Sequence, residues 1–272
     1  MGDISTPNST MFLKDLGNRL PIEIGGKELQ YFKFKDWTFK EEEYIAKTKT
    51  KAKNIGRFIT EVLVHMLVCV GDEDFETKDR NEKLIFLSGQ PMGNILYMYI
   101  YLRYDQLGED LKLVFKCPFC NHNVDDFVTD IGQIDVDCKF GQFDEIVKYK
   151  LKKPITLESG EQLVDHVKLG LAKWSMMEQT ENGILDEAEM KKYSYRHSIV
   201  GVDDVTGYVS PDEVINKLKK QDIERLSVAI ATHNAGPSIQ AEIECEKCGN
   251  KFWRQIDWSY DHFFGVGSLP QN

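Results

Sequence analysis

The sequence predicts an α+β protein built from two related halves (β-hairpin, helices, zinc-knuckle strands) that share one four-cysteine zinc ribbon. Stretches of alternating apolar residues, typical of strands, are interspersed with stretches whose apolar residues recur at helical spacing. The same order of elements occurs twice along the 272 residues. Each occurrence ends in a Cys-x-x-Cys pair, the first at Cys117 and Cys120 and the second at Cys245 and Cys248.

The composition is typical of a globular protein, with 42% hydrophobic and 29% charged residues. The net charge of −10 disfavours nonspecific binding to nucleic acid or anionic membranes, which requires an excess of Lys and Arg. Residues 1–19 are polar and lack the apolar segment of a secretory signal, so we predict a flexible N-terminal arm. No run approaches the ~18 apolar residues of a membrane helix, and we expect no membrane association.

The first half is predicted to span residues 20–145 and to begin with a hairpin around Gly25-Gly26. Its first helix is rich in Glu, Lys and Ala and should be exposed, whereas the next has the apolar spacing of a buried helix. The expected elements are hairpin strands at 20–24 and 28–34, helices at 39–52, at 55–70 and between Pro91 and Gly108, and strands at 111–115 and 124–128.

The second half is predicted to span residues 146–264, followed by a C-terminal tail at 265–272. Its expected elements are hairpin strands at 149–157 and 162–169, a helix at 171–180, a segment at 197–204 that echoes 67–72, a helix starting at 210–213, a helix at 221–232, and strands at 239–244 and 251–256. Aromatic residues are dense near its end, and two interpretations stay open: core packing or a docking tail. These residues are Trp253, Trp258, Tyr260, Phe263 and Phe264.

Each Cys-x-x-Cys pair is expected at the tip of a strand–turn–strand unit, where two thiolates can converge on one metal ion. Asn121 and Gly249 directly follow the two pairs, and both residue types tolerate the left-handed backbone that such turns use. Pro118 presets the backbone of the first turn because its ring fixes φ. Turn chemistry therefore favours metal binding in both halves.

One pair supplies two thiolates, whereas a closed structural zinc site needs four ligands in a tetrahedron. We therefore predict one structural zinc ion bound by all four paired cysteines: Cys117, Cys120, Cys245 and Cys248. Two alternatives stay open, namely a redox pair and two separate metal sites of which the first uses His122. Cys69 should be a buried small side chain, and Cys138 an ordinary strand or loop residue.

The sequence contains no phosphate-binding loop, dinucleotide-binding fingerprint, nucleophile elbow or His-Glu-x-x-His zinc motif. His65 and His166 fall within helix and strand patterns, which favours structural roles for both. A zinc ion with four thiolate ligands has no open coordination position, so it would not activate water. We predict that the protein is not an enzyme.

Several features occur in an order that one known family also shows. They are the run at residues 29–34, Glu42-Glu43, the apolar helix ending near Cys69, the segment 94–103, Gly108, and the strand that enters Cys117-Pro118-Phe119-Cys120. In this order they resemble the baseplate hub assembly family of T-even-like contractile-tailed bacteriophages, over most of residues 20–264. The sequence departs from the family at Asn121, where glycine would follow the cysteine pair, and in a polar insert at 181–196.

The resemblance implies a non-enzymatic role in the assembly or structure of the baseplate hub of a contractile tail. It implies partners among hub, spike or tape-measure proteins, and a location in the host cytoplasm during assembly or in the virion. The four cysteines carry over as zinc ligands only.

A second hypothesis is a zinc-ribbon accessory factor that binds nucleic acid. It would require a basic, aromatic surface beside the knuckles, and the net charge argues against it. The basic residues near the two pairs are Lys112, Lys116, Lys247, Lys251 and Arg254.

Overall fold

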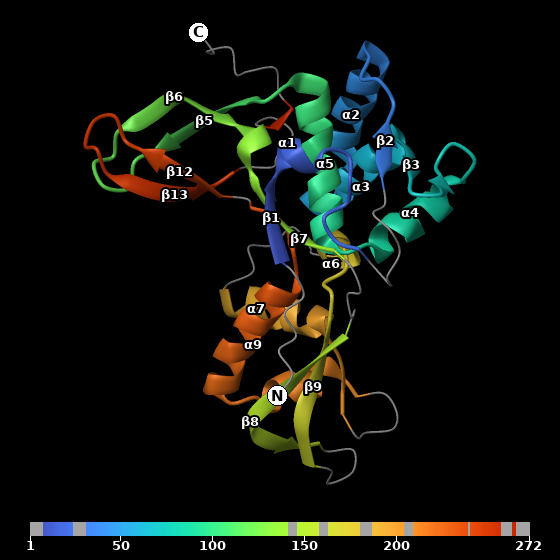
Figure 1. Ribbon diagram of the computed structural model, residues 1–272, viewed down its shortest axis with the longest axis vertical. Coiled ribbons are helices and arrows are strands. Elements are labelled where there is room, and N and C mark those ends of the chain that lie inside the picture. Colours follow the sequence, from blue (N-terminus) through green and yellow to red (C-terminus); the bar gives the residue numbers. More distant parts are fainter. Residues whose placement is uncertain are drawn as a thin grey trace.

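Figure 1 shows a computed structural model of the chain, which has a mixed α and β fold. The structure describes residues 8–23, 31–140, 146–157, 163–179, 187–203, 209–238, 240–256 and 263–264. None of the helices in these ranges combines the length and the apolar composition that a membrane crossing requires.

The elements of the first part of the chain occur in the following order. They are β1 (Asn8–Phe12), α1 (Leu13–Leu16), β2 (Phe32–Phe34), α2 (Phe39–Lys51), α3 (Ile55–Met66), β3 (Leu67–Val70), β4 (Glu73–Asp74), α4 (Arg80–Gly89), α5 (Met92–Leu107), β5 (Asp110–Lys116), β6 (Asn123–Asp130), a 3-10 turn (Ile131–Gln133) and β7 (Asp135–Lys139).

The second part continues with a longer hairpin and then repeats the sequence of helices followed by paired strands. Its elements are β8 (Ile146–Thr156), β9 (Leu163–Gly170), α6 (Ser175–Gln179), α7 (Glu187–Ser198), β10 (Ile199–Val202), α8 (Pro211–Lys217), α9 (Lys220–His233), β11 (Gly236–Pro237), β12 (Gln240–Glu244) and β13 (Lys251–Gln255).

Residues 8–19 do not form the flexible arm that the sequence predicted. β1 pairs antiparallel with β7, and Leu13 and Leu16 of α1 are buried in the core. The apolar side chains of Met11, Leu13 and Leu16 outweigh the polar character of the segment, because their burial in the first core offsets the cost of ordering it. Residues 1–7 lie outside the described residues.

The predicted first hairpin is present in part, because Arg19 and Tyr31 form an antiparallel bridge and the N–H of Phe32 donates to the carbonyl of Asn18 at 3.0 Å. β2 pairs antiparallel with β3, and the hydrogen-bonded partners include Phe32 with Val70. Residues 67–70 therefore form a strand, and the helix predicted at 55–70 ends at Met66. Residues 24–30, which would contain the turn and the strand ends, lie outside the described residues.

The second hairpin is confirmed as β8 and β9, which pair antiparallel, although its turn lies outside the described residues. α6 is shorter than the predicted helix at 171–180. In both halves a helix passes directly into a strand without a loop: α3 into β3, and α7 into β10. The two strands then pair in the same way, Leu67 with Phe34 and Ile199 with Leu169, each next to an irregularity in register.

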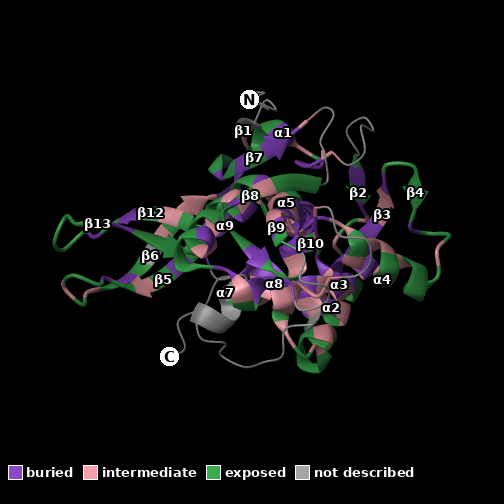
Figure 2. Ribbon diagram, turned by 90° about the horizontal axis from the view of Figure 1, so that it is seen from below, coloured by how far each residue is buried: buried purple, intermediate pink, exposed green. Residues whose placement is uncertain are grey.

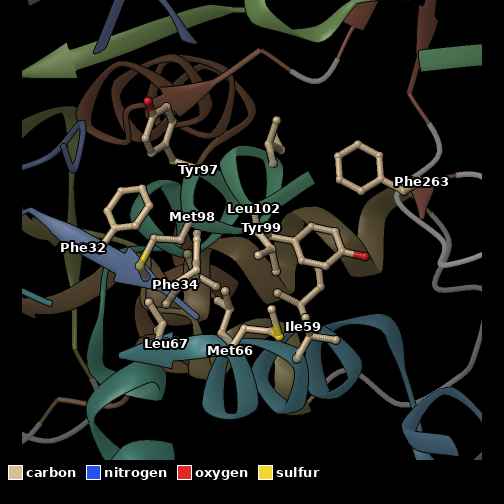
Figure 3. Packing of buried hydrophobic residues seen from close by; sticks show 14 of the residues in the cluster. Phe32, Phe34, Ile59, Met66, Leu67, Tyr97, Met98, Tyr99, Leu102 and Phe263 are labelled. Carbon is tan, nitrogen blue, oxygen red and sulfur yellow. The ribbon is translucent and has the colours of Figure 1, made fainter. Parts of the chain in front are cut away.

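Two main cores lie in the two halves, and Figure 3 shows packing in the larger one. This first core also takes up residues assigned by sequence to the second half, namely Trp174, Ile256, Phe263 and Phe264. The ring of Phe263 stacks on Tyr99 at 5.3 Å between centroids, and Phe264 stacks on Trp37 at 5.1 Å. Core packing is therefore the role of Phe263 and Phe264, and residues from both sides of the predicted boundary at 145/146 contribute to the first core.

Helix α5 leads to the first knuckle, and the segment at residues 235–236 leads to the second. The two cross so closely that no side chain fits between them. A Cβ atom placed on Gly93 of α5 would lie 1.9 Å from the carbonyl oxygen of Ala235. Next to it, the buried side chain of Asn94 accepts from the N–H of Ile22 at 3.0 Å and donates to its carbonyl at 3.1 Å. The crossing anchors the segment that leads into β12 against the N-terminal end of α5.

The β5–β6 and β12–β13 hairpins project together from one side of the molecule, as both Figure 1 and Figure 2 show. Each is a two-stranded antiparallel sheet of its own, and they have the same register at the tip. The residue before the first cysteine pairs with the residue seven positions later, Lys116 with Asn123 and Glu244 with Lys251. The two tips carry the cysteine pairs.

Candidate metal centre

The sulfur atoms of the four paired cysteines converge at the tips of the two hairpins, where all four lie within 4.8 Å of one another. Sγ of Cys117 lies 3.8 Å from Sγ of Cys248, and Sγ of Cys120 lies 3.7 Å from Sγ of Cys245. A tetrahedron of sulfurs about 2.3 Å from a central zinc ion has edges of about 3.8 Å. The sulfur positions therefore match the geometry of a four-thiolate metal site.

Both turns have the same hydrogen bonds, which explains how the sequence builds two equivalent half-sites. The N–H of Cys117 donates to the carbonyl of His122 at 2.8 Å, and the N–H of Cys245 donates to Asn250 at 3.0 Å. The carbonyl of each of these cysteines accepts from the fifth residue of its turn, Asn121 or Gly249.

Asn121 and Gly249 have φ values of 58° and 68°, as the sequence predicted for a left-handed position after each pair. A side chain added at Gly249 would be strained only by the left-handed backbone conformation, because its Cβ atom would meet nothing within 4 Å. Glycine and asparagine are the residues that adopt it at least cost.

We expect Gly249→Asn to retain full metal binding and near-normal stability, because Asn121 already occupies the corresponding position in the first turn. Gly249→Val should lower the free energy of unfolding by about 1–2 kcal/mol, since a β-branched residue is disfavoured at positive φ. Urea unfolding of both variants checks this prediction. Equal stability of the valine and asparagine variants would contradict it.

Apolar and aromatic side chains pack beneath the sulfurs and join the two hairpins. The ring of Phe115 in β5 meets Phe252 in β13 edge to face, at 5.9 Å between centroids. Ile243, Cys117 and Cys245 are fully buried in the same small cluster. Across the hairpins, Arg254 donates from Nη2 to the carbonyl of Lys116 at 3.0 Å. This packing joins the two knuckles beside the sulfur atoms.

The four thiols differ in their surroundings. Cys117 and Cys245 are buried, whereas Cys248 is the most exposed. The backbone N–H and the side-chain amide of Asn250 donate to the sulfur of Cys248, and with these bonds its pKa falls to about 7. At Cys120, a bond from the N–H of His122 lowers the pKa, but burial and the three neighbouring sulfurs raise it to about 12.

These opposite shifts indicate that a thiolate forms more readily at Cys248, whereas burial and the neighbouring sulfurs oppose the ionisation of Cys120. A bound cation removes this obstacle, because it stabilises each negative sulfur and displaces the remaining protons. Sulfur ligands in a tetrahedron suit zinc or iron among the common metals. The arrangement as a whole can hold a metal ion in a closed coordination sphere.

The other two cysteines and the candidate histidines lie elsewhere. Cys138 is buried in β7 within the first core, and Cys69 in β3 is half-buried. His65 stacks on Tyr44 in α2, and burial lowers its pKa. His166 lies in β9 and bonds to the neighbouring Asp165. His122 contributes its backbone to the first turn and is not a member of the four-ligand group.

Sequence reasoning missed the residues that support the site from outside the Cys-x-x-Cys pairs. Arg254 was considered only as a basic residue, whereas it cross-links the hairpins. Asn250 was not considered, although an amide two residues after a ligating cysteine is a recognisable signal for a bond to sulfur. Lys251, a second basic candidate, lies 3.9 Å from the carboxylates of Glu242 and Glu244.

No family model matches the chain, and neither a curated protein nor a solved structure matches it.

Proposed function

We propose that the chain is a non-enzymatic structural or assembly protein in which one zinc ion fastens two related knuckles. The observation that carries this proposal is the convergence of the two Cys-x-x-Cys pairs at the sulfur spacing of tetrahedral zinc. Cys120 meets Cys245 across 125 residues of sequence, and Cys117 meets Cys248 across 131. Four thiolates fill the coordination sphere of zinc, and such sites stabilise folds.

We further propose that the two halves arose from one duplicated unit, with the zinc ribbon formed by one knuckle from each copy. Three parallels support this: the direct helix-to-strand passages into β3 and β10, the matching pairing of these strands, and the identical hydrogen bonds of the two cysteine turns. A duplicated unit would need its partner copy to complete the metal site, because each knuckle supplies two of the four ligands.

Within this class, the sequence resemblance supports a role in the assembly or structure of the baseplate hub of a contractile phage tail. The partners would be hub, spike or tape-measure proteins, which the chain would meet in the host cytoplasm during assembly. The zinc ribbon in this role keeps a binding scaffold in shape.

Affinity isolation of the tagged chain from cells that are assembling contractile tails tests this proposal. We expect hub, spike or tape-measure proteins to be enriched over a control with the tag alone, as measured by mass spectrometry. Isolation without any tail protein, from cells in which tails form normally, would contradict the baseplate role while leaving the zinc site unaffected.

A second candidate is a nucleic-acid-binding zinc ribbon, favoured by two exposed aromatic side chains on the knuckle hairpins. Phe119 is 60% exposed and Trp253 is 63% exposed, and such rings can stack with unpaired bases. The net charge of −10 and the carboxylates beside Lys251 argue against it. We therefore expect that a labelled single-stranded oligonucleotide does not bind to the protein at about 0.1 M salt. Salt-dependent binding that is lost in the Trp253→Ala variant would favour this second candidate instead.

A further inference from the structure

A cavity of about 400 Å³ lies on the first half of the molecule, among α2, α3, the connection between them, and the first residue of α4. Tyr44 and Ala52 give it a partly apolar wall. Its remaining lining is strongly basic, with a single carboxylate, Glu61. The cationic side chains are Lys47, Lys51, Lys53, Arg57 and Arg80.

Two of these cations already have carboxylate partners. Lys47 pairs with Glu43 at 2.7 Å, and Arg80 pairs with Glu61. Arg57 donates from Nε to the main-chain carbonyl of Glu178 at 3.0 Å, which satisfies one donor but leaves its charge uncompensated. In the part of the chain that the structure describes, no ion pair involves Lys51, Lys53 or Arg57.

The ends of the helices explain only part of this charge. Lys51 is in the last turn of α2, where a cation is favoured by the helix dipole. Lys53 and Arg57, however, lie just before and within the first turn of α3, at the positive end of that dipole, where no acidic residue is present. Cations at this end repel the dipole and each other, so an anion in the cavity would remove an unfavourable interaction.

We infer that this cavity binds a carboxylate-rich segment of a partner protein. The size of the cavity, the uncompensated cations and the apolar wall suit Asp or Glu side chains on a peptide whose backbone lies against Tyr44. An extended polyanion such as nucleic acid fits less well, because Glu61 lines the cavity, Glu43 pairs with Lys47 of the lining, and the chain as a whole has a charge of −10. The inference goes beyond the proposed function and does not depend on the baseplate role.

Fluorescence anisotropy of a labelled oligoglutamate peptide, titrated with the full-length zinc-loaded protein at about 0.1 M salt, tests the inference. The double variant Lys51→Glu, Lys53→Glu should bind about tenfold more weakly than the unmodified protein. The matched control is Lys152→Glu, Lys153→Glu, which reverses two exposed lysines of β8 and changes the net charge equally. We expect the affinity of this control for the peptide to lie within about twofold of that of the unmodified protein, because the salt screens the long-range effect of the changed net charge.

Circular dichroism and zinc content establish that both double variants are folded. Absence of saturable peptide binding to the unmodified protein would overturn the inference, as would an equal loss in the two double variants. Binding of an oligonucleotide or of inorganic phosphate at this cavity more tightly than the peptide would also overturn it, in favour of a phosphate ligand.

Discussion

Cys245→Ser is expected to abolish zinc binding and to lower the free energy of unfolding by about 4 kcal/mol. Cys245 is fully buried between the knuckles, and its loss leaves three thiolates for an ion that needs four ligands. The zinc would otherwise close a loop of more than a hundred residues, and a cross-link over a loop of this size contributes about 4–5 kcal/mol in the chain-entropy model. Metal analysis and urea unfolding measure the two effects.

The matched control is Cys69→Ser, a half-buried cysteine outside the site, which should keep one zinc per chain and lose at most about 1 kcal/mol. A strong chelator should destabilise the unmodified protein and Cys69→Ser but have no effect on Cys245→Ser. Full zinc content in Cys245→Ser would show that the two pairs do not share an ion. If each Cys-x-x-Cys pair bound its own metal ion, Cys245→Ser would instead lose half of the metal.

Gly93→Ala is the second substitution for which we expect a large effect, with a loss of about 3 kcal/mol in the free energy of unfolding. The added methyl group would lie 1.9 Å from the carbonyl oxygen of Ala235, and Gly236 lies against the same turn of α5. Because the obstructing atoms belong to the backbone, no side-chain rotation can relieve the overlap, so α5 and β11 must separate. Unfolding by urea measures the loss.

Gly89→Ala provides the control, since a Cβ atom there would meet nothing within 4 Å and the residue ends α4. It should be neutral or slightly stabilising, because alanine reduces the freedom of the unfolded chain. The crossing at Gly93 also anchors the segment that leads into the β12–β13 hairpin, so Gly93→Ala should weaken zinc retention in competition with a chelator. Normal zinc retention and stability in Gly93→Ala would contradict the tight crossing.

Local chemistry explains which elements could be predicted. α3 has clear helical periodicity, and the end of α5 at Gly108, with φ of 85°, follows from a residue that tolerates this backbone. The β5–β6 hairpin needed only strand alternation and a recognisable turn. Lys47 and Lys51 belong to the helix predicted at 39–52, which its composition identified as exposed but not as part of the wall of a cavity.

The sequence by itself determined the elements of the metal centre, because the spacing within each Cys-x-x-Cys pair and the following Asn121 or Gly249 specify each turn locally. Only the tertiary structure decided what depends on residues distant in the chain. The pairing of β2 with β3, the incorporation of residues 8–19, and the burial of Phe263 and Phe264 against Tyr99 are examples. The physical reason is that long-range burial and strand pairing compete with local preference, and their outcome depends on which surfaces the rest of the chain brings into contact.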